Sequence, residues 1–200
     1  MRKRGIFMFK FSTKKLVRAG LIAALYAAIT YVFAPYAYGP FQIRPAEALC
    51  ILPLFFVEAV PGLFVGCALA NLLSQYGAYD VIFGSITTLV AALITYAIGK
   101  LLKEKPLSVI LGGIPPIILN ALCIPLIIAL TGAGMGAYLT LVAEFLLTET
   151  VWVYALGIPL YFAIKRLGKS VKFFRSEEYE EELKNSEGNI PPENSDDKTV

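Results

Sequence analysis

The chain has 200 residues, of which 57% are hydrophobic and only 16% are charged, and its mean hydropathy is +0.66. Soluble domains are about 45–50% apolar and about 25% charged, so this composition excludes an ordinary soluble domain. The net charge is +3, but only ten charged side chains lie in the 146 residues from 19 to 164. That middle region is predicted to lie in a membrane.

Several chemistries are excluded by residues that the sequence lacks. There is no histidine, which removes the usual proton shuttle and the commonest metal ligand. Cys50, Cys67 and Cys123 lie in apolar runs without a Cys-x-x-Cys pair, so no disulfide or thiolate metal site is indicated. Gly168-Lys169-Ser170 looks like the end of a P-loop, but Ala163 stands where that motif needs glycine. We expect no enzyme, no catalytic residue, no metal and no cofactor.

Six apolar segments follow one another along the chain and predict an all-α membrane protein with six transmembrane helices. They lie at about residues 14–34, 45–57, 60–75, 79–101, 106–131 and 137–165. The second and third would be only about 20–24 Å long, short of the roughly 30 Å hydrocarbon core, so they are expected to lean on neighbours or enter the membrane in part. Prolines 115, 116 and 125 predict a kink or unwinding in the fifth helix.

Three regions are predicted along the chain. Residues 1–13 form a basic cytoplasmic segment, and residues 14–168 form the transmembrane substrate-binding domain. Residues 169–200 form a cytoplasmic tail, which from Glu177 is acidic and polar and lacks an apolar period, so we expect it to be disordered.

Basic residues around the predicted helices set the orientation. Three groups fall on one side if six segments alternate: Lys14, Lys15 and Arg18; Lys100, Lys103 and Lys105; and Lys165, Arg166, Lys169 and Lys172. The opposite side carries Arg44 alone. The positive-inside rule makes the first side cytoplasmic, with both termini there, in a multi-pass protein of the cell membrane.

Polar residues inside an apolar chain are the candidate binding residues, because an ionisable group at depth costs about 2.5–3.5 kcal/mol on insertion scales. The candidates are Arg44, Glu47, Asn71, Asp80, Asn120, Glu144 and Glu149. The predicted orientation places them toward the outside or the midplane, where they are expected to meet in one outward-facing pocket. Four carboxylates against one arginine favour a ligand that is cationic or rich in N–H donors. For each residue taken alone, a structural role is an equal alternative to ligand binding. Arg44 would then pair with Glu47, and the other residues would cap helix ends or lie among the lipid headgroups.

The first helix carries two rows of small residues at i, i+4 spacing, one of Ala19, Ala23 and Ala27 and one of Gly20, Ala24 and Ala28. Small residues let a second helix approach closely in a membrane. The pattern alone leaves open whether that second helix belongs to this chain or to a partner.

Several of these residues lie in motifs that resemble the QueT family. The motifs are Gln42-Ile43-Arg44-Pro45-Ala46-Glu47-Ala48-Leu49, Pro61-Gly62-Leu63, Gly66-Cys67-Ala68, Ala70-Asn71-Leu72, Asp80 with Phe83-Gly84-Ser85 and Thr88-Leu89, and Pro115-Pro116 with Asn120. The resemblance covers roughly residues 12–165. That family comprises substrate-binding S components of energy-coupling factor (ECF) transporters assigned to queuosine precursors.

The resemblance implies a six-helix S-component bundle in the bilayer, an outward pocket for a 7-deazaguanine, and coupling to a transmembrane T component with a pair of ATPases. It also implies that Ala19, Ala23 and Ala27 dock on the T component. Arg44 would hold Glu47 rather than touch the ligand, and no nucleic acid is expected as a partner. The alternatives are a stand-alone channel or facilitator, an S component for another vitamin-like heterocycle, and a structural membrane protein without a ligand.

Overall fold

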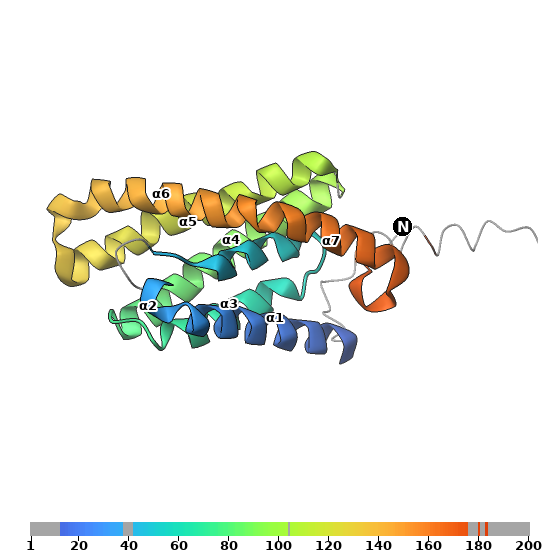
Figure 1. Cartoon of the computed structure of the whole chain (residues 1–200), viewed down its shortest axis with the longest axis horizontal. Helices are drawn as coiled ribbons and strands as arrows, with labels where there is room; N and C mark the ends of the chain where they lie inside the picture. Colours follow the sequence, from blue (N-terminus) through green and yellow to red (C-terminus); the bar gives the residue numbers. More distant parts are fainter. Residues whose placement is uncertain (1–12, 38–41, 104, 176–179, 181–182, 184–200) are drawn as a thin grey trace, which may run out of the picture.

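A computed structural model describes residues 13–37, 42–103, 105–175, 180 and 183. In the described residues every regular element is a helix (Figure 1). The α-helices are α1 (Thr13–Val32), α2 (Ala34–Ala37), α3 (Ala59–Asn71), α4 (Ser85–Leu102), α5 (Pro106–Ile128), α6 (Tyr138–Ala155) and α7 (Gly157–Ser170). The 3-10 helices are η1 (Pro45–Leu54), η4 (Met135–Ala137) and η5 (Lys172–Phe174), and the π-helical turns are η2 (Asp80–Gly84) and η3 (Ala129–Ala133).

Four helical segments are long and apolar enough to cross a membrane, and they span Thr13–Val32, Asp80–Leu102, Pro106–Ala133 and Met135–Ser170. The prediction of an all-α membrane protein is thus confirmed. The two remaining predicted helices are short, with η1 and α3 holding 10 and 13 residues. Each is about 20 Å long at the rise of its helix type, so six full spans are not seen among the described residues.

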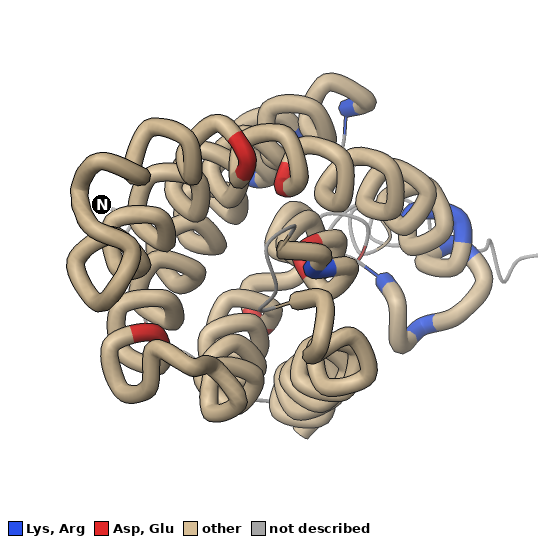
Figure 2. The backbone as a smooth tube through the Cα atoms, turned by 60° about the vertical axis from the view of Figure 1, so that its left-hand side comes forward, with Lys and Arg blue, Asp and Glu red and all other residues tan. Residues whose placement is uncertain are grey.

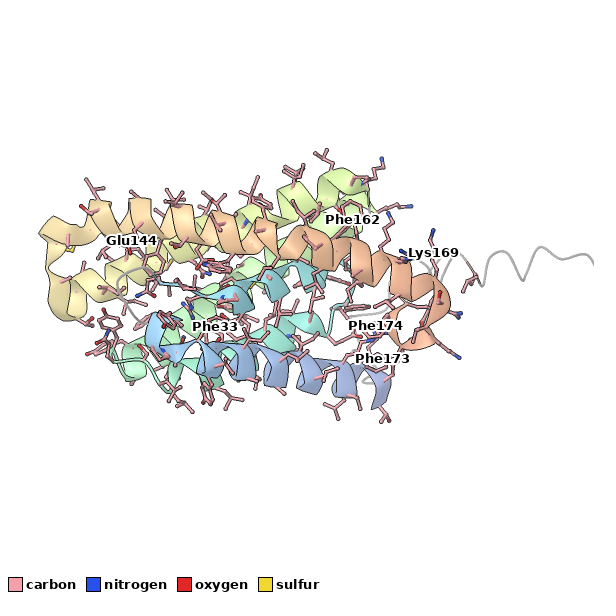
Figure 3. All side chains as sticks on the ribbon, in the orientation of Figure 1. Phe33, Glu144, Phe162, Lys169, Phe173 and Phe174 are labelled. Atoms are coloured by element: carbon pink, nitrogen blue, oxygen red, sulfur yellow. The ribbon has the colours of Figure 1, made fainter. Side chains whose placement is uncertain are left out.

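The helices run lengthwise and form a bundle with two distinct ends (Figure 1). We call the basic end the one where α1 begins, α4 and α5 are joined, and α7 ends. The opposite, distal end holds α2, the turn before α4 and the turn between α5 and α6. Lys and Arg positions gather toward the basic end (Figure 2), and Lys169 is labelled there (Figure 3). The predicted tail and basic start lie outside the described residues, apart from residues 13, 169–175, 180 and 183.

Two local features depart from the predicted helices. The prolines at 115, 116 and 125 lie inside a continuous α5. Pro116 cannot donate to the carbonyl of Gly112 four residues earlier, and the Thr95 hydroxyl donates to that oxygen at 2.9 Å instead. The last predicted helix is two consecutive helices, α6 and α7, with an interruption at Leu156. Pro159 has no amide hydrogen, so the backbone hydrogen bond to the carbonyl four residues earlier is missing there.

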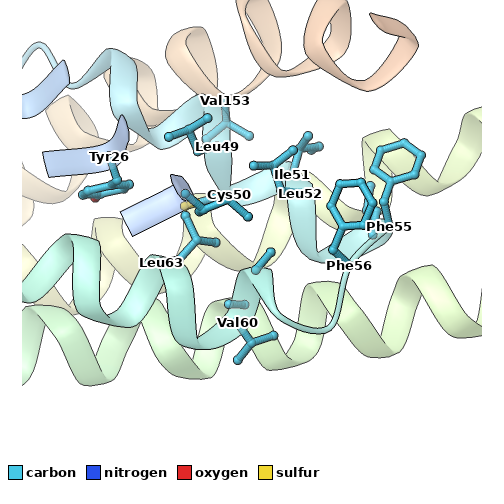
Figure 4. Packing of buried hydrophobic residues seen from close by; sticks show 14 of the residues in the cluster. Tyr26, Leu49, Cys50, Ile51, Leu52, Phe55, Phe56, Val60, Leu63 and Val153 are labelled. Carbon is cyan, nitrogen blue, oxygen red and sulfur yellow. The ribbon is translucent and has the colours of Figure 1, made fainter. Parts of the chain in front are cut away.

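The 3-10 helix η1 occupies the middle of the bundle, and every one of its residues is buried. Its apolar side chains lie between Tyr26 of α1 and the pair Phe55–Phe56 (Figure 4). Glycines let the helices around it approach closely: a Cβ at Gly99 would meet the backbone oxygen of Leu54 at 2.6 Å. The buried core around η1 therefore fixes the polar side chains that η1 carries at its distal end.

Candidate functional site

Glu47, in the first turn of η1, is the best-connected polar residue of the interior and is only 1% exposed. Its Oε1 accepts a hydrogen bond from the Tyr26 hydroxyl at 2.6 Å. Its Oε2 accepts from Asn120 Nδ2 at 3.2 Å and from the Cys50 thiol at 3.2 Å. Helices α1 and α5 and η1 itself therefore fix this carboxylate. Sequence reasoning missed Tyr26 and Cys50, because nothing in their spacing marks them as partners of Glu47.

Arg44 links Glu47 to the next helix. Its Nε lies 3.7 Å from Glu47 Oε1, and its Nη2 donates to Asn71 Oδ1 at 3.4 Å. Asn71, the last residue of α3, donates through Nδ2 to the backbone oxygen of Asp80 at 2.9 Å. The predicted Arg44–Glu47 pair is present. Hydrogen bonds through Asn71 connect it to Asp80, the first residue of the π-helical turn η2 that precedes α4.

Glu149 of α6 lies at the other side of Glu47. It is 3% exposed, interacts with the Asn120 side chain, and lies within electrostatic reach of Glu47 and Arg44. The structure thus brings six of the seven predicted binding residues together. We call the sequence Glu149, Asn120, Glu47, Arg44, Asn71, Asp80 the polar row.

The two ends of the polar row differ from its middle. Among the residues that the structure describes, Asp80 Oδ1 and Glu149 Oε2 are buried and have no hydrogen-bond partner. Both side chains are 3% exposed. A buried carboxylate oxygen without a donor costs free energy, so each one calls for an explanation. Glu58 Oε2 at the basic end is also without a partner within the described chain, so it is the charge balance that distinguishes the polar row. The row also holds three carboxylates against one guanidinium, so it is suited to a ligand that brings N–H donors or positive charge.

Glu144 is the seventh predicted binding residue, and it lies apart. It is half-buried, near the distal end of α6 (Figure 3), and among the described residues no hydrogen bond or ion pair joins its carboxylate to the polar row. Glu144 and Glu149 are five residues apart on one α-helix, so their side chains point about 140° apart around the helix axis. The structure therefore does not bring it to the site.

Aromatic side chains lie near the turn that precedes α4. Tyr76, Tyr79 and Phe83 line an apolar cavity of about 900 Å³ between α4 and α5. Its other walls include Cys123, Leu126 and Leu130, which are half-buried or exposed, so the cavity opens to the outside of the bundle. Burial and then the charge of Asp80 raise the pKa of Tyr76 above its usual value, which places the phenol close to that end of the polar row.

The small-residue row of Ala19, Ala23 and Ala27 faces the inside of the bundle. A Cβ at Gly62 of α3 would meet the Ala19 oxygen at 2.8 Å, and one at Gly66 would meet Ala23 Cα at 3.0 Å. Ala23 and Ala27 are 6% and 8% exposed. The close approach expected of this row is made with α3 of the same chain, which corrects its assignment as an outward docking surface. The second row, Gly20, Ala24 and Ala28, is exposed.

A second buried ion pair, which sequence reasoning did not predict, lies at the basic end. Arg18 Nη1 donates to Glu58 Oε1 at 2.6 Å, and both side chains are at most 6% exposed. Arg18 Nη2 donates to the backbone oxygens of Phe173 and Arg175, and the guanidinium lies 4.3 Å from the centre of the Phe56 ring. Glu58 is 3% exposed, so this ion pair is buried inside the basic end of the bundle.

Comparison with known proteins identifies the family. A family model described as "QueT transporter" matches residues 16–166. The "Queuosine precursor transporter QueT" of Lactococcus lactis subsp. cremoris (strain MG1363) is 34% identical over 85 residues, which cover 42% of this chain and 50% of that relative. The aligned part thus spans half the length of the relative. No solved structure matches.

The family match covers the four candidate membrane spans almost completely and includes every residue of the polar row. Its several apolar helices fit a multi-pass protein of the cell membrane, as the name of this family of transporters implies. With its buried polar row set inside an apolar bundle, the chain belongs to the QueT transporter family.

Proposed function

We propose that the chain is the substrate-binding subunit, or S component, of an ATP-driven ECF importer and captures a queuosine precursor, a 7-deazaguanine, at the polar row. The observation that carries the proposal is the surplus of buried carboxylates in the polar row, where Asp80 Oδ1 and Glu149 Oε2 have no hydrogen-bond partner among the described residues. The chain also belongs to a family of transporters. A guanine-like edge offers N–H and NH₂ donors to a carboxylate and a carbonyl to an amide. The name of the Lactococcus relative supports this ligand class.

Calorimetric titration of the purified protein with 7-aminomethyl-7-deazaguanine tests the proposal. Glu149→Gln keeps the size of the side chain and removes its charge, and loss of a charge-assisted hydrogen bond is worth about 1.5–3 kcal/mol, or about 10- to 150-fold in affinity. Glu144→Gln is the matched control, because it makes the same change on the same helix outside the polar row. If neither 7-deazaguanine nor guanine binds, or both variants bind equally well, the proposed site is wrong.

Coupling to ATP distinguishes an importer subunit from a stand-alone facilitator. The partners in the proposal are a T component and two ATPases, and we assign their contact to the exposed row of Gly20, Ala24 and Ala28. Ala24→Trp would block close approach of another helix. We expect it to abolish co-purification with the T component and uptake while ligand binding persists. Uptake that survives depletion of ATP and loss of the T component would instead favour a facilitator.

The proposal also sets the orientation, with the basic end in the cytoplasm and the distal end outside. Single cysteines on a background lacking Cys50, Cys67 and Cys123 test it. Lys103→Cys should react with a membrane-impermeant maleimide only after the cells are opened, whereas Gln75→Cys should react in intact cells, since both side chains are exposed. The reverse pattern would place the polar row on the cytoplasmic side and overturn capture from outside.

A further inference from the structure

The two ends of the polar row offer different chemistry to a ligand. At one end, Glu149 adjoins Asn120, whose Nδ2 already donates to Glu47. Glu149 Oε2, on α6, is buried without a hydrogen-bond partner among the described residues, so it is an open acceptor beside Asn120 of α5. An open carboxylate oxygen beside an amide matches a planar group that carries N–H donors along one edge.

At the other end, the amide beside Asp80 is already engaged. Asn71 Oδ1 accepts from Arg44, and Asn71 Nδ2 donates to the Asp80 backbone oxygen and lies 3.4 Å from the Cys67 sulfur. This amide therefore has little left for a ligand, and the Asp80 carboxylate acts as a single anionic group. A single carboxylate suits a compact ammonium, which is a point charge with three rotatable donors.

Gly84 lets the backbone pack closely against Asp80 Oδ1 and the Asn71 amide. Gly84, one turn further along the π-helical turn, brings its Cα so close that an added Cβ would lie 3.2 Å from Asp80 Oδ1 and 2.7 Å from Asn71 Nδ2. The π-helical turn inserts an extra residue per turn, and such turns are frequent at functional sites. A side chain at position 84 would therefore crowd both the unpartnered oxygen of Asp80 and the Asn71 amide.

The centre of the polar row balances its own charge, while its ends do not. Arg44 contacts Glu47, and Tyr26, Cys50 and Asn120 donate to the same carboxylate. One guanidinium cannot also neutralise two further carboxylates, at Asp80 and Glu149, in a low-dielectric interior. A ligand with one positive charge would reduce this surplus, and it would do so best at the end where the carboxylate stands alone.

We propose that the polar row recognises two groups of one ligand: Glu149 and Asn120 bind the donor edge of the 7-deazaguanine ring, and Asp80 binds a cationic amine on the arm of the same ring. This inference rests on the proposed function and adds to it a preference for an aminomethyl over a cyano arm. Asp80 is then the residue that determines specificity for the arm, and Glu149 is the residue that determines affinity for the ring.

Titration of each variant with two ligands tests the assignment, using 7-aminomethyl-7-deazaguanine and 7-cyano-7-deazaguanine. The unaltered protein should bind the aminomethyl compound at least about 10-fold more tightly, in line with a charge-assisted bond. Asp80→Asn should reduce this ratio to about one. Glu149→Gln should weaken both ligands by a similar factor of about 10 or more and preserve the ratio.

Asp80→Glu, which keeps the charge, is the matched variant and should retain the preference. The inference is overturned if Asp80→Asn keeps the preference, if Glu149→Gln abolishes it, or if the unaltered protein binds the cyano compound as tightly. These outcomes leave the proposed function standing, because a 7-deazaguanine still binds. Failure of both compounds to bind the unaltered protein would instead overturn the proposed function itself.

Discussion

Two arginines are buried in the part of the chain that the structure describes, and their surroundings differ. At the basic end, Arg18 faces one carboxylate, Glu58, at 2.6 Å, and Arg18 also donates to two backbone oxygens and stacks on Phe56. In the polar row, Arg44 faces Glu47 at 3.7 Å, while Asp80 and Glu149 add two carboxylates that it does not neutralise. The first group is a charge-balanced structural pair, although Glu58 Oε2 has no hydrogen-bond partner among the described residues, and the second is a site with a surplus of carboxylates.

This difference indicates what each region contributes. A buried pair whose two charges cancel, and whose guanidinium also donates to two backbone oxygens, holds α1, the start of α3 and the segment after α7 together. A buried surplus of carboxylates lowers the stability of the empty protein and is retained where it serves binding. We therefore expect changes at the basic end to affect unfolding, and changes in the polar row to affect ligand affinity.

The largest expected effect is on stability, from Arg18→Met. This variant leaves the Glu58 carboxylate buried without its cation, and breaking a buried pair in this way costs about 3–5 kcal/mol. Thermal unfolding in detergent should show a clear loss, while affinity for a 7-deazaguanine, measured below the unfolding temperature, stays unchanged.

The double variant Arg18→Met/Glu58→Met separates loss of the pair from loss of packing. With both charges removed, most of the lost stability should return, because well-packed apolar residues often replace a buried ion pair without cost. An Arg18→Met protein that unfolds like the original would mean that the pair is not structural, and the comparison would fail at the basic end.

An intermediate effect is expected from two matched glycine substitutions. A Cβ at Gly168 would lie 2.8 Å from the backbone oxygen of Phe174, whereas a Cβ at Gly84 would lie 2.7 Å from Asn71 Nδ2. Overpacking costs about 1–3 kcal/mol. Gly168→Ala should lower the unfolding temperature and spare affinity, and Gly84→Ala should lower ligand affinity by about 10-fold or more. Unfolding temperature and ligand affinity should be measured for both variants. The comparison would be contradicted if Gly168→Ala lowered affinity while Gly84→Ala lowered only the unfolding temperature.

Much of the fold was predictable from the sequence, because hydropathy and loop charges respond to the bilayer rather than to packing detail. The four long apolar segments and the shortness of the second and third were predicted, as was the approach of Arg44 to Glu47. The continuity of α5 was not, because the Thr95 hydroxyl that satisfies the Gly112 carbonyl comes from a helix distant in sequence. The break at Leu156 carried a signal, Pro159, that was not used.

The candidate site was predicted in part for a similar reason. Polar residues in an apolar chain stand out whatever the fold, so six members of the polar row were identified. Glu144 and Glu149 look alike in the sequence, and only the facing of α6 separates them. The two small-residue rows of α1 are also alike, and the glycines of α3 decide that Ala23 faces inward. Which side of a helix faces the interior depends on the helices packed against it, and the spacing of residues within one helix does not reveal these neighbours.

The smallest expected effect has the opposite sign and tests the comparison most directly. Glu149→Gln should stabilise the ligand-free protein by about 0.5–2 kcal/mol, because it removes one negative charge from a buried surplus while the amide keeps the size of the side chain. Thermal unfolding without ligand measures this gain. Glu144→Gln, on the same helix but half-buried, should change stability by less than about 0.5 kcal/mol. If Glu149→Gln instead destabilises the empty protein as Arg18→Met does, Glu149 is part of a satisfied structural network, and the polar row is not the open site that its unpartnered oxygens indicate.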